Sequence, residues 1–215
     1  LLAVAGNANL QLFSTETWEP VFEATDFFEN NTYGILFSPD GSRLYRFPSA
    51  SVIPGQVISV SEDGATVEIV GEIPVLEDFV ATGIFVGDGS QLLVRLVNNY
   101  TMYLYDLTAD PIADPTPVVV GEGNVRYNDF AQLPDGGLIG IGGGSVISNS
   151  FWGHLDAETL LPVEQIAGLH RHRTYGGAVS ADGTRLITVG NDTFIRVWDV
   201  ATNALIAEFD VLHNT

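Results

Sequence analysis

The chain contains no cysteine and no lysine, so its eight basic residues, all arginine, stand against 27 acidic residues. Without cysteine it can form no disulfide, no thiolate zinc site and no cysteine nucleophile. A formal net charge of −19 repels nucleic acid and anionic lipid, so neither is expected as a partner. Such an acidic surface favours solubility, attracts cations or basic proteins, and suits a high-salt or extracellular setting.

Long apolar runs and catalytic signatures are also missing. No uninterrupted apolar stretch approaches the roughly 18 residues of a membrane-spanning helix, so membrane insertion is not expected. The chain has neither a Gly-x-Ser-x-Gly nucleophile motif nor a His-Glu-x-x-His zinc motif. Its glycine-rich stretch, 136–144, lacks the Gly-Lys-Ser/Thr ending of a phosphate loop. We therefore expect no catalytic residue, no cofactor and no metal ligand.

A short turn signature recurs along the chain at a nearly constant spacing. Each copy places Asp-Gly between two apolar runs, which is typical of a tight hairpin turn where glycine supplies a positive φ. The copies are Ser38-Pro39-Asp40-Gly41, Gly87-Asp88-Gly89, Pro134-Asp135-Gly136 and Ala181-Asp182-Gly183. Their aspartates are 48, 47 and 47 residues apart, a period typical of a β-propeller or a related repeat architecture.

Between these turns the hydrophobic pattern predicts strands and no helices. Apolar residues alternate or form short runs bounded by Gly, Pro, Asn and Asp. In the last unit the strands are expected at 175–180, 185–189, 194–199 and 204–209, joined by short hairpins into one blade. We expect an all-β chain of about five such blades, a single β-propeller domain over 1–215 or part of a larger propeller. The blades are predicted at about 1–25, 32–71, 79–121, 125–167 and 170–210.

Two units depart from this pattern. The first matches only the second, third and fourth strands of the others, so it lacks the innermost strand. That strand would come from a preceding part of the natural protein or from another chain, because open sheet edges are normally covered. In the second unit, Pro48 and Pro54 interrupt the middle strands, which predicts an edge or a bulge there.

The last unit carries residues that resemble a blade of the WD-repeat (WD40-type) β-propeller family. That family often ends its third strand in Trp-Asp, here Trp198-Asp199, with an aspartate in the preceding turn, here Asp192. It places a Ser or Thr in the second strand, here Thr188, and a histidine before the Asp-Gly turn, here His170. The resemblance implies a structural tetrad of these four side chains, since a buried indole N–H and a buried imidazole each need a partner.

The resemblance is clearest over residues 169–209, and the other blades are degenerate. Where Trp-Asp is expected, the third unit has Tyr105-Asp106, the fourth Leu155-Asp156 and the first Phe13-Ser14. No histidine matching the one at position 170 is present in the earlier units.

A polar loop between the first two units contains a pair of aromatic residues, Phe27 and Phe28. Strand alternation cannot bury two consecutive side chains, so one of them would be exposed as an anchor for a partner. The alternative is that both pack between blades.

The segment His170-Arg171-His172-Arg173 concentrates positive charge in an otherwise acidic chain. It holds a quarter of the arginines and half of the histidines. Arg171 and Arg173, with His172 between them, would contact an anion or a carboxylate of a partner. The alternative is that they pair with acidic groups of the surface. A zinc site would need a third ligand beyond the two histidines, and the sequence offers none.

These features favour a non-catalytic protein-interaction or assembly scaffold. Its partners would be other protein chains or further domains of the same protein. One alternative is the propeller portion of an enzyme, lactonase-like or peptidase-associated, with acids or histidines converging at a channel. Another is a structural subunit of an extracellular surface layer or filament, with edges paired to neighbouring copies.

Overall fold

A computed structural model describes residues 1–49, 52–97, 101–118, 126–143, 150–156, 159–167 and 169–211. The regular structure of these residues consists of nineteen β-strands without a helix, so the prediction of an all-β chain is confirmed. The chain divides into two compact units, Leu1–Val118 and Val119–Thr215.

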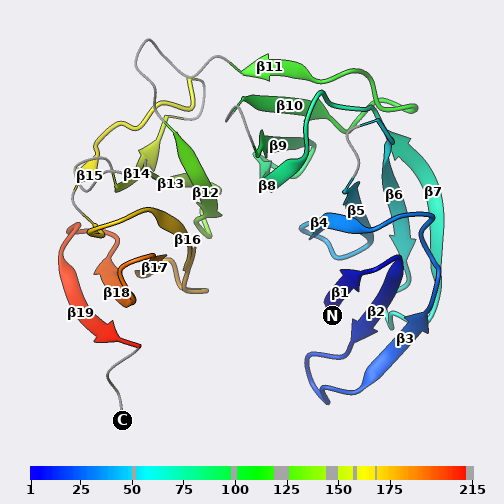
Figure 1. Cartoon of the computed structure of the whole chain (residues 1–215), viewed down its shortest axis with the longest axis horizontal. Coiled ribbons are helices and arrows are strands. Elements are labelled where there is room, and N and C mark those ends of the chain that lie inside the picture. Colours follow the sequence, from blue (N-terminus) through cyan, green and yellow to red (C-terminus); the bar gives the residue numbers. More distant parts are fainter. Residues whose placement is uncertain are drawn as a thin grey trace. The chain divides into compact units, whose positions relative to one another are not determined.

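The first unit contains three antiparallel sheets (Figure 1). Sheet A has three strands: β1 (Leu2–Gly6), β2 (Asn9–Phe13) and β3 (Pro20–Ala24). Sheet B has four: β4 (Thr32–Phe37), β5 (Arg43–Pro48), β6 (Gly55–Val60) and β7 (Val67–Ile73). Sheet C also has four: β8 (Val80–Val86), β9 (Gln91–Leu96), β10 (Met102–Asp106) and β11 (Thr116–Val118).

The second unit contains two four-stranded antiparallel sheets (Figure 1). Sheet D has β12 (Tyr127–Gln132), β13 (Leu138–Gly142), β14 (Phe151–Leu155) and β15 (Ile166–Ala167). Sheet E has β16 (Thr174–Val179), β17 (Arg185–Gly190), β18 (Phe194–Asp199) and β19 (Leu205–Asp210). In all five sheets the strands follow one another in chain order, so the predicted four-stranded antiparallel units are confirmed for sheets B to E.

The two prolines of sheet B do not interrupt its middle strands. Pro48 is the last residue of β5 and Pro54 directly precedes β6, and both strands lie inside the order β4-β5-β6-β7. The edge alternative was therefore wrong, because a proline at a strand end removes no hydrogen bond from the interior of the ladder. A bulge does lie beside Pro48, between its ladder partner Thr32 and Gly34.

The recurrent Asp-Gly turns join the first and second strands of sheets B to E. In each turn the aspartate Oδ1 accepts a hydrogen bond, 3.0 Å long, from the backbone N–H two residues ahead. The glycine after the aspartate has a φ between +72° and +89° in all four turns. Asp40 accepts a hydrogen bond from Ser38, and Asp182 accepts one from Ser180. Together with the other hydrogen bonds within the same turns, these bonds lower the pKa values of both aspartates to about 2.

A β-bulge recurs at one position in the same four sheets. The ladder between the first and second strands skips a single residue: Tyr33, Ala81, Asn128 or Tyr175. Each skipped residue lies seven positions before the turn aspartate. Since a bulge bends and twists its strand locally, its identical placement makes the four sheets copies of one structural unit.

Apolar side chains join neighbouring sheets inside each unit. In sheet B the consecutive residues Leu44 and Tyr45 point to opposite faces, and both are buried. Leu44 belongs to a cluster shared with sheet A, and Tyr45 to a cluster shared with sheet C. In the second unit, Trp152 of sheet D and Trp198 of sheet E belong to one cluster. Sheet B is thus covered on both of its faces.

The turns of successive sheets also touch within a unit. A Cβ atom at Gly183 would lie 2.8 Å from Cδ of Pro134, and one at Gly89 would lie 3.0 Å from Cγ of Pro39. Each of these glycines therefore packs against the proline of the preceding turn. A Cβ atom at Gly41 would meet nothing within 4 Å.

We expect Gly183→Ala to destabilise the second unit more than Gly41→Ala destabilises the first unit. Both glycines have a φ of +72°, so each substitution incurs the same backbone strain of about 1–2 kcal/mol. Only the new methyl group at position 183 collides with a rigid ring, which should add about 1 kcal/mol or more. Urea unfolding of the two variants measures the difference, and equal losses would show that the contact between turns contributes nothing.

Candidate functional site

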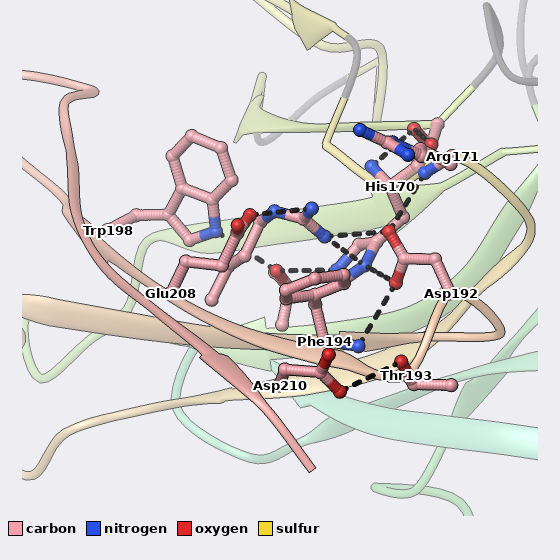
Figure 2. Close-up of polar contacts among 11 residues, drawn as sticks. His170, Arg171, Asp192, Thr193, Phe194, Trp198, Glu208 and Asp210 are labelled. Carbon is pink, nitrogen blue, oxygen red and sulfur yellow. Dashed lines mark hydrogen bonds and ion pairs between the residues drawn. The ribbon is translucent and has the colours of Figure 1, made fainter. Parts of the chain in front are cut away.

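The four residues of the predicted tetrad lie together at sheet E. Figure 2 labels three of them, His170, Asp192 and Trp198. Nε1 of Trp198 is 2.9 Å from Oγ1 of Thr188, which is 3.0 Å from Nε2 of His170. Nδ1 of His170 is 2.7 Å from Oδ1 of Asp192. Strands β17 and β18 hold Thr188 and Trp198, while His170 precedes β16 and Asp192 lies in the turn between β17 and β18.

For a neutral imidazole, the donors and acceptors of this chain of contacts have one consistent assignment. An indole N–H can only donate, so Oγ1 of Thr188 accepts from Trp198 and its own hydrogen is left for Nε2 of His170. The imidazole proton is then on Nδ1, which donates to Asp192. Burial lowers the pKa of His170 below the usual range even though Asp192 favours the charged form, so the imidazole is neutral at pH 7.

Arg196 and Glu208 extend the tetrad into a charged network that sequence reasoning missed. Nη1 of Arg196 is 2.9 Å from Oδ2 of Asp192, and its Nη2 is 2.7 Å from Oε2 of Glu208. Nη1 also lies 2.6 Å from Nδ1 of His170. That nitrogen already directs its proton at Asp192, so this last contact is a close approach and not a hydrogen bond.

The position of Arg196 in the strand could have revealed its role. It precedes Trp198 by two residues and lies directly opposite Thr188 in the ladder. Side chains two apart on a strand share one face, so Arg196 had to reach the buried side together with the tetrad.

The carboxylate of Asp192 accepts three short hydrogen bonds and a longer one, at 3.4 Å, from the backbone N–H of Phe194. Besides His170 and Arg196, the backbone N–H of Arg171 donates to its Oδ2 at 2.9 Å. Burial of this carboxylate opposes ionisation, but the three hydrogen bonds together outweigh it and hold the pKa of Asp192 well below its usual range. The ionised carboxylate thus fixes both the imidazole of one residue and the peptide group of the next.

The backbone of the basic segment 170–173 is anchored at several points. The hydroxyl of Ser150 accepts a hydrogen bond from the N–H of His170 and donates to its carbonyl, both at 3.0 Å. The N–H of Asn191 donates to the carbonyl of Arg173 at 2.9 Å. With the contact of Arg171 to the tetrad carboxylate, these bonds hold the segment in one conformation.

The side chains of this segment, in contrast, face solvent. Arg171, His172 and Arg173 are exposed, and neither guanidinium forms an ion pair with any residue that the structure describes. The predicted alternative, pairing with acidic surface groups, is therefore not observed there. The guanidinium of Arg173 lies 5.9 Å from the ring centroid of Tyr175, which is 54% exposed. This set can bind a carboxylate or another anion.

Phe28 is not a contact residue, because only 2% of it is exposed. Phe27 is half-buried and packs edge-to-face on Phe28 and Phe22, with ring centroids 5.0 and 5.8 Å apart. The prediction of an exposed anchor was wrong for Phe28, whereas Phe27 is partly exposed. The two residues lie in a loop after β3, where strand alternation does not apply, and both pack on the cluster between sheets A and B.

In sheet B a different buried residue occupies the position that corresponds to Thr188 of sheet E. Arg46, like Thr188, is the sixth residue after the turn aspartate, and it is fully buried. Its guanidinium lies 4.4 Å from the ring centroid of Phe28. It donates only to uncharged acceptors of nearby residues of the same chain, namely Asn30, Asn31, Thr32 and Gln56. Burial lowers its pKa to about 10.

A shallow pocket of about 580 Å³ lies at the opposite end of sheets D and E from the basic segment. Its polar lining includes Asp135, His154, Asp182 and Arg185, and Nη1 of Arg185 is 2.8 Å from Oδ2 of Asp199. The sequence pattern did not predict this pocket, because its lining comes from turns and strand residues of two different sheets.

No group of three or more histidine, aspartate or glutamate side chains could hold a metal ion within the described ranges. In the same ranges, no helix has the length and apolar character needed to cross a membrane. The chain matches no model of a protein family, and no curated protein is significantly similar to it.

We expect Thr188→Val to destabilise the second unit strongly. Valine keeps the shape of threonine but leaves the indole N–H of Trp198 and Nε2 of His170 buried without a partner. Two unsatisfied buried groups cost roughly 2–4 kcal/mol together, measurable by urea unfolding followed through tryptophan fluorescence. The exposed Thr66 offers a matched control, and Thr66→Val should change stability by less than about 0.5 kcal/mol. A loss at position 188 as small as the control would contradict the assigned hydrogen bonds.

The stability of the second unit should decline in two steps as the pH falls. The folded pKa of His170 lies below its ordinary 6.5 and that of Asp192 below its ordinary 3.8. The unfolded chain therefore binds more protons, first below pH 6.5 and again below pH 3.8, and each uptake favours unfolding. Urea unfolding between pH 8 and 3 measures this, and His170→Gln should remove the first step. The exposed His172 is the control, since His172→Gln should leave both steps intact. Persistence of the first step in His170→Gln would refute its assignment.

Proposed function

We propose that the chain is a non-catalytic protein-interaction scaffold whose sheets are blades of a WD-repeat-like β-propeller, complete or part of a larger one. The spacing of 47 to 48 residues between the turn aspartates supports a repeat of this kind. The identical bulge and turn in sheets B to E support it further. Blades that radiate from an axis are covered on both faces, as sheet B is.

The observation that carries the binding role is the pair of unpaired guanidinium groups on a fixed backbone. Arg171 and Arg173 stay without an ion pair among the described residues, in a chain with 27 acidic residues. Arginine forms bidentate hydrogen bonds to carboxylates, and arginine and tyrosine are enriched among residues that dominate binding energy. The proposed partner is therefore an acidic segment of another protein chain or domain, with Tyr175 packing beside it.

The anchored backbone contributes to binding through entropy. Ordering a loop on association costs free energy, and a loop that is already ordered avoids this cost. The tetrad supplies that order, because Asp192 holds the N–H of Arg171. Its role in the proposed function is to position the arginines.

The test uses single charge reversals that change the net charge by the same amount. Arg171→Glu and Arg173→Glu should each weaken binding of fluorescein-labelled peptides rich in aspartate and glutamate by at least tenfold, measured by fluorescence anisotropy in 0.15 M salt. Arg43→Glu, at an exposed arginine of sheet B, should have little effect. Equal weakening by all three variants, or no binding of the acidic peptides by the original chain, would refute the proposed contact.

A further inference from the structure

One backbone position is held by the same hydrogen bond in sheets B to E. It lies nine residues before the turn aspartate and directly before the first strand of its sheet. Its carbonyl accepts a hydrogen bond, between 2.8 and 3.0 Å long, from the N–H of the residue directly after the second strand. The residue at this position is Asn31 in sheet B, Phe79 in sheet C, Arg126 in sheet D and Arg173 in sheet E.

Of these four sheets, only D and E carry a charge at this anchored position. Asn31 and Phe79 of the first unit are uncharged, whereas the second unit has an exposed arginine, Arg126 or Arg173, in each of its sheets. Arg171 lies two residues before Arg173. Three of the eight arginines of the chain are therefore found within three residues of the start of β12 or β16.

The strands β12 and β16 lie next to each other with these arginines at the same end. Nδ2 of Asn128, the second residue of β12, donates to the carbonyl of Thr174, the first residue of β16, at 2.7 Å. It also donates, at 2.9 Å, to the carbonyl of Gly143, whose own N–H holds Arg126. One amide side chain thus links the backbone beside Arg126 to the backbone beside Arg173.

We propose that Arg126 is a third contact of the site formed by Arg171 and Arg173, and that the bound segment carries acidic residues at two places along its length. This inference rests on the proposed function, because it extends the same site from sheet E to sheet D. A carboxylate that binds one arginine in the bidentate mode uses both of its oxygens. Arginines on two separately anchored backbones therefore select a segment with more than one acidic group.

The charge of the whole chain favours such a multiple contact. With a formal net charge of −19, the chain repels an acidic segment at long range. Salt at 0.15 M screens this repulsion beyond about 8 Å, so the attraction has to come from arginines close to the segment. A third arginine increases that local attraction for a segment whose acidic residues reach both sheets.

Peptides with one or two acidic clusters test this inference. Fluorescein-labelled peptides of equal length carry two glutamate pairs separated by glycine and serine spacers of different lengths. In the matched one-pair peptides, glutamine replaces one of the two glutamate pairs. Fluorescence anisotropy in 0.15 M salt measures the affinities. At the best spacing we expect the two-pair peptide to bind about fivefold more tightly than either one-pair peptide, which is the upper range for an exposed ion pair.

Arg126→Gln should remove this gain while changing the affinity for the one-pair peptides by less than about twofold. Arg43→Gln removes the same charge from an exposed position of sheet B and should leave the gain intact. A gain that persists in Arg126→Gln, or that Arg43→Gln removes to the same extent, overturns the inference. The proposed function survives that result if Arg171→Glu and Arg173→Glu still weaken binding. If the original chain binds none of the acidic peptides, the proposed function is refuted and this inference with it.

Discussion

The carboxylate of Asp192 is the group on which the rest of sheet E depends. It accepts from His170, from Arg196 and from the backbone of Arg171, and so links the turn after β17 to β18 and to the segment before β16. A buried carboxylate is stable only when such donors replace water. The hydrogen bonds that stabilise this charge therefore also fix the backbone that carries the exposed arginine side chains. In this way the buried network of the sheet positions residues on its surface.

Sheets B and E show that one backbone unit can be stabilised by different chemistry. In sheet E a neutral hydroxyl, Thr188, bridges an imidazole and an indole, whereas in sheet B the equivalent Arg46 lies over the ring of Phe28. The turns and bulges are the same in both sheets. Repetition in this chain is thus a property of the backbone, and the buried polar groups vary within it.

The period of the Asp-Gly turns predicted the sheets well, because turn chemistry is local and depends on few residues. Side chains buried through loops were predicted poorly. Phe28 lies outside any strand, so the period-two rule did not apply to it, and Arg196 required the register between β17 and β18. Four residues of the network were found because the WD-repeat resemblance supplied their spacing. Glu208 lacked such a signal, since its partner is defined only once β19 pairs with β18.

The repeated bulge leaves one residue in each of sheets B to E outside the pairing of the ladder. This residue is a tyrosine in sheet B, an alanine in sheet C, an asparagine in sheet D and a tyrosine in sheet E. The side chain of Asn128 donates a hydrogen bond to the carbonyl of Thr174 in the next sheet. A position released from the hydrogen-bond pattern can change identity during evolution without altering the strands around it. Successive sheets can in this way differ in surface chemistry while they keep the same architecture.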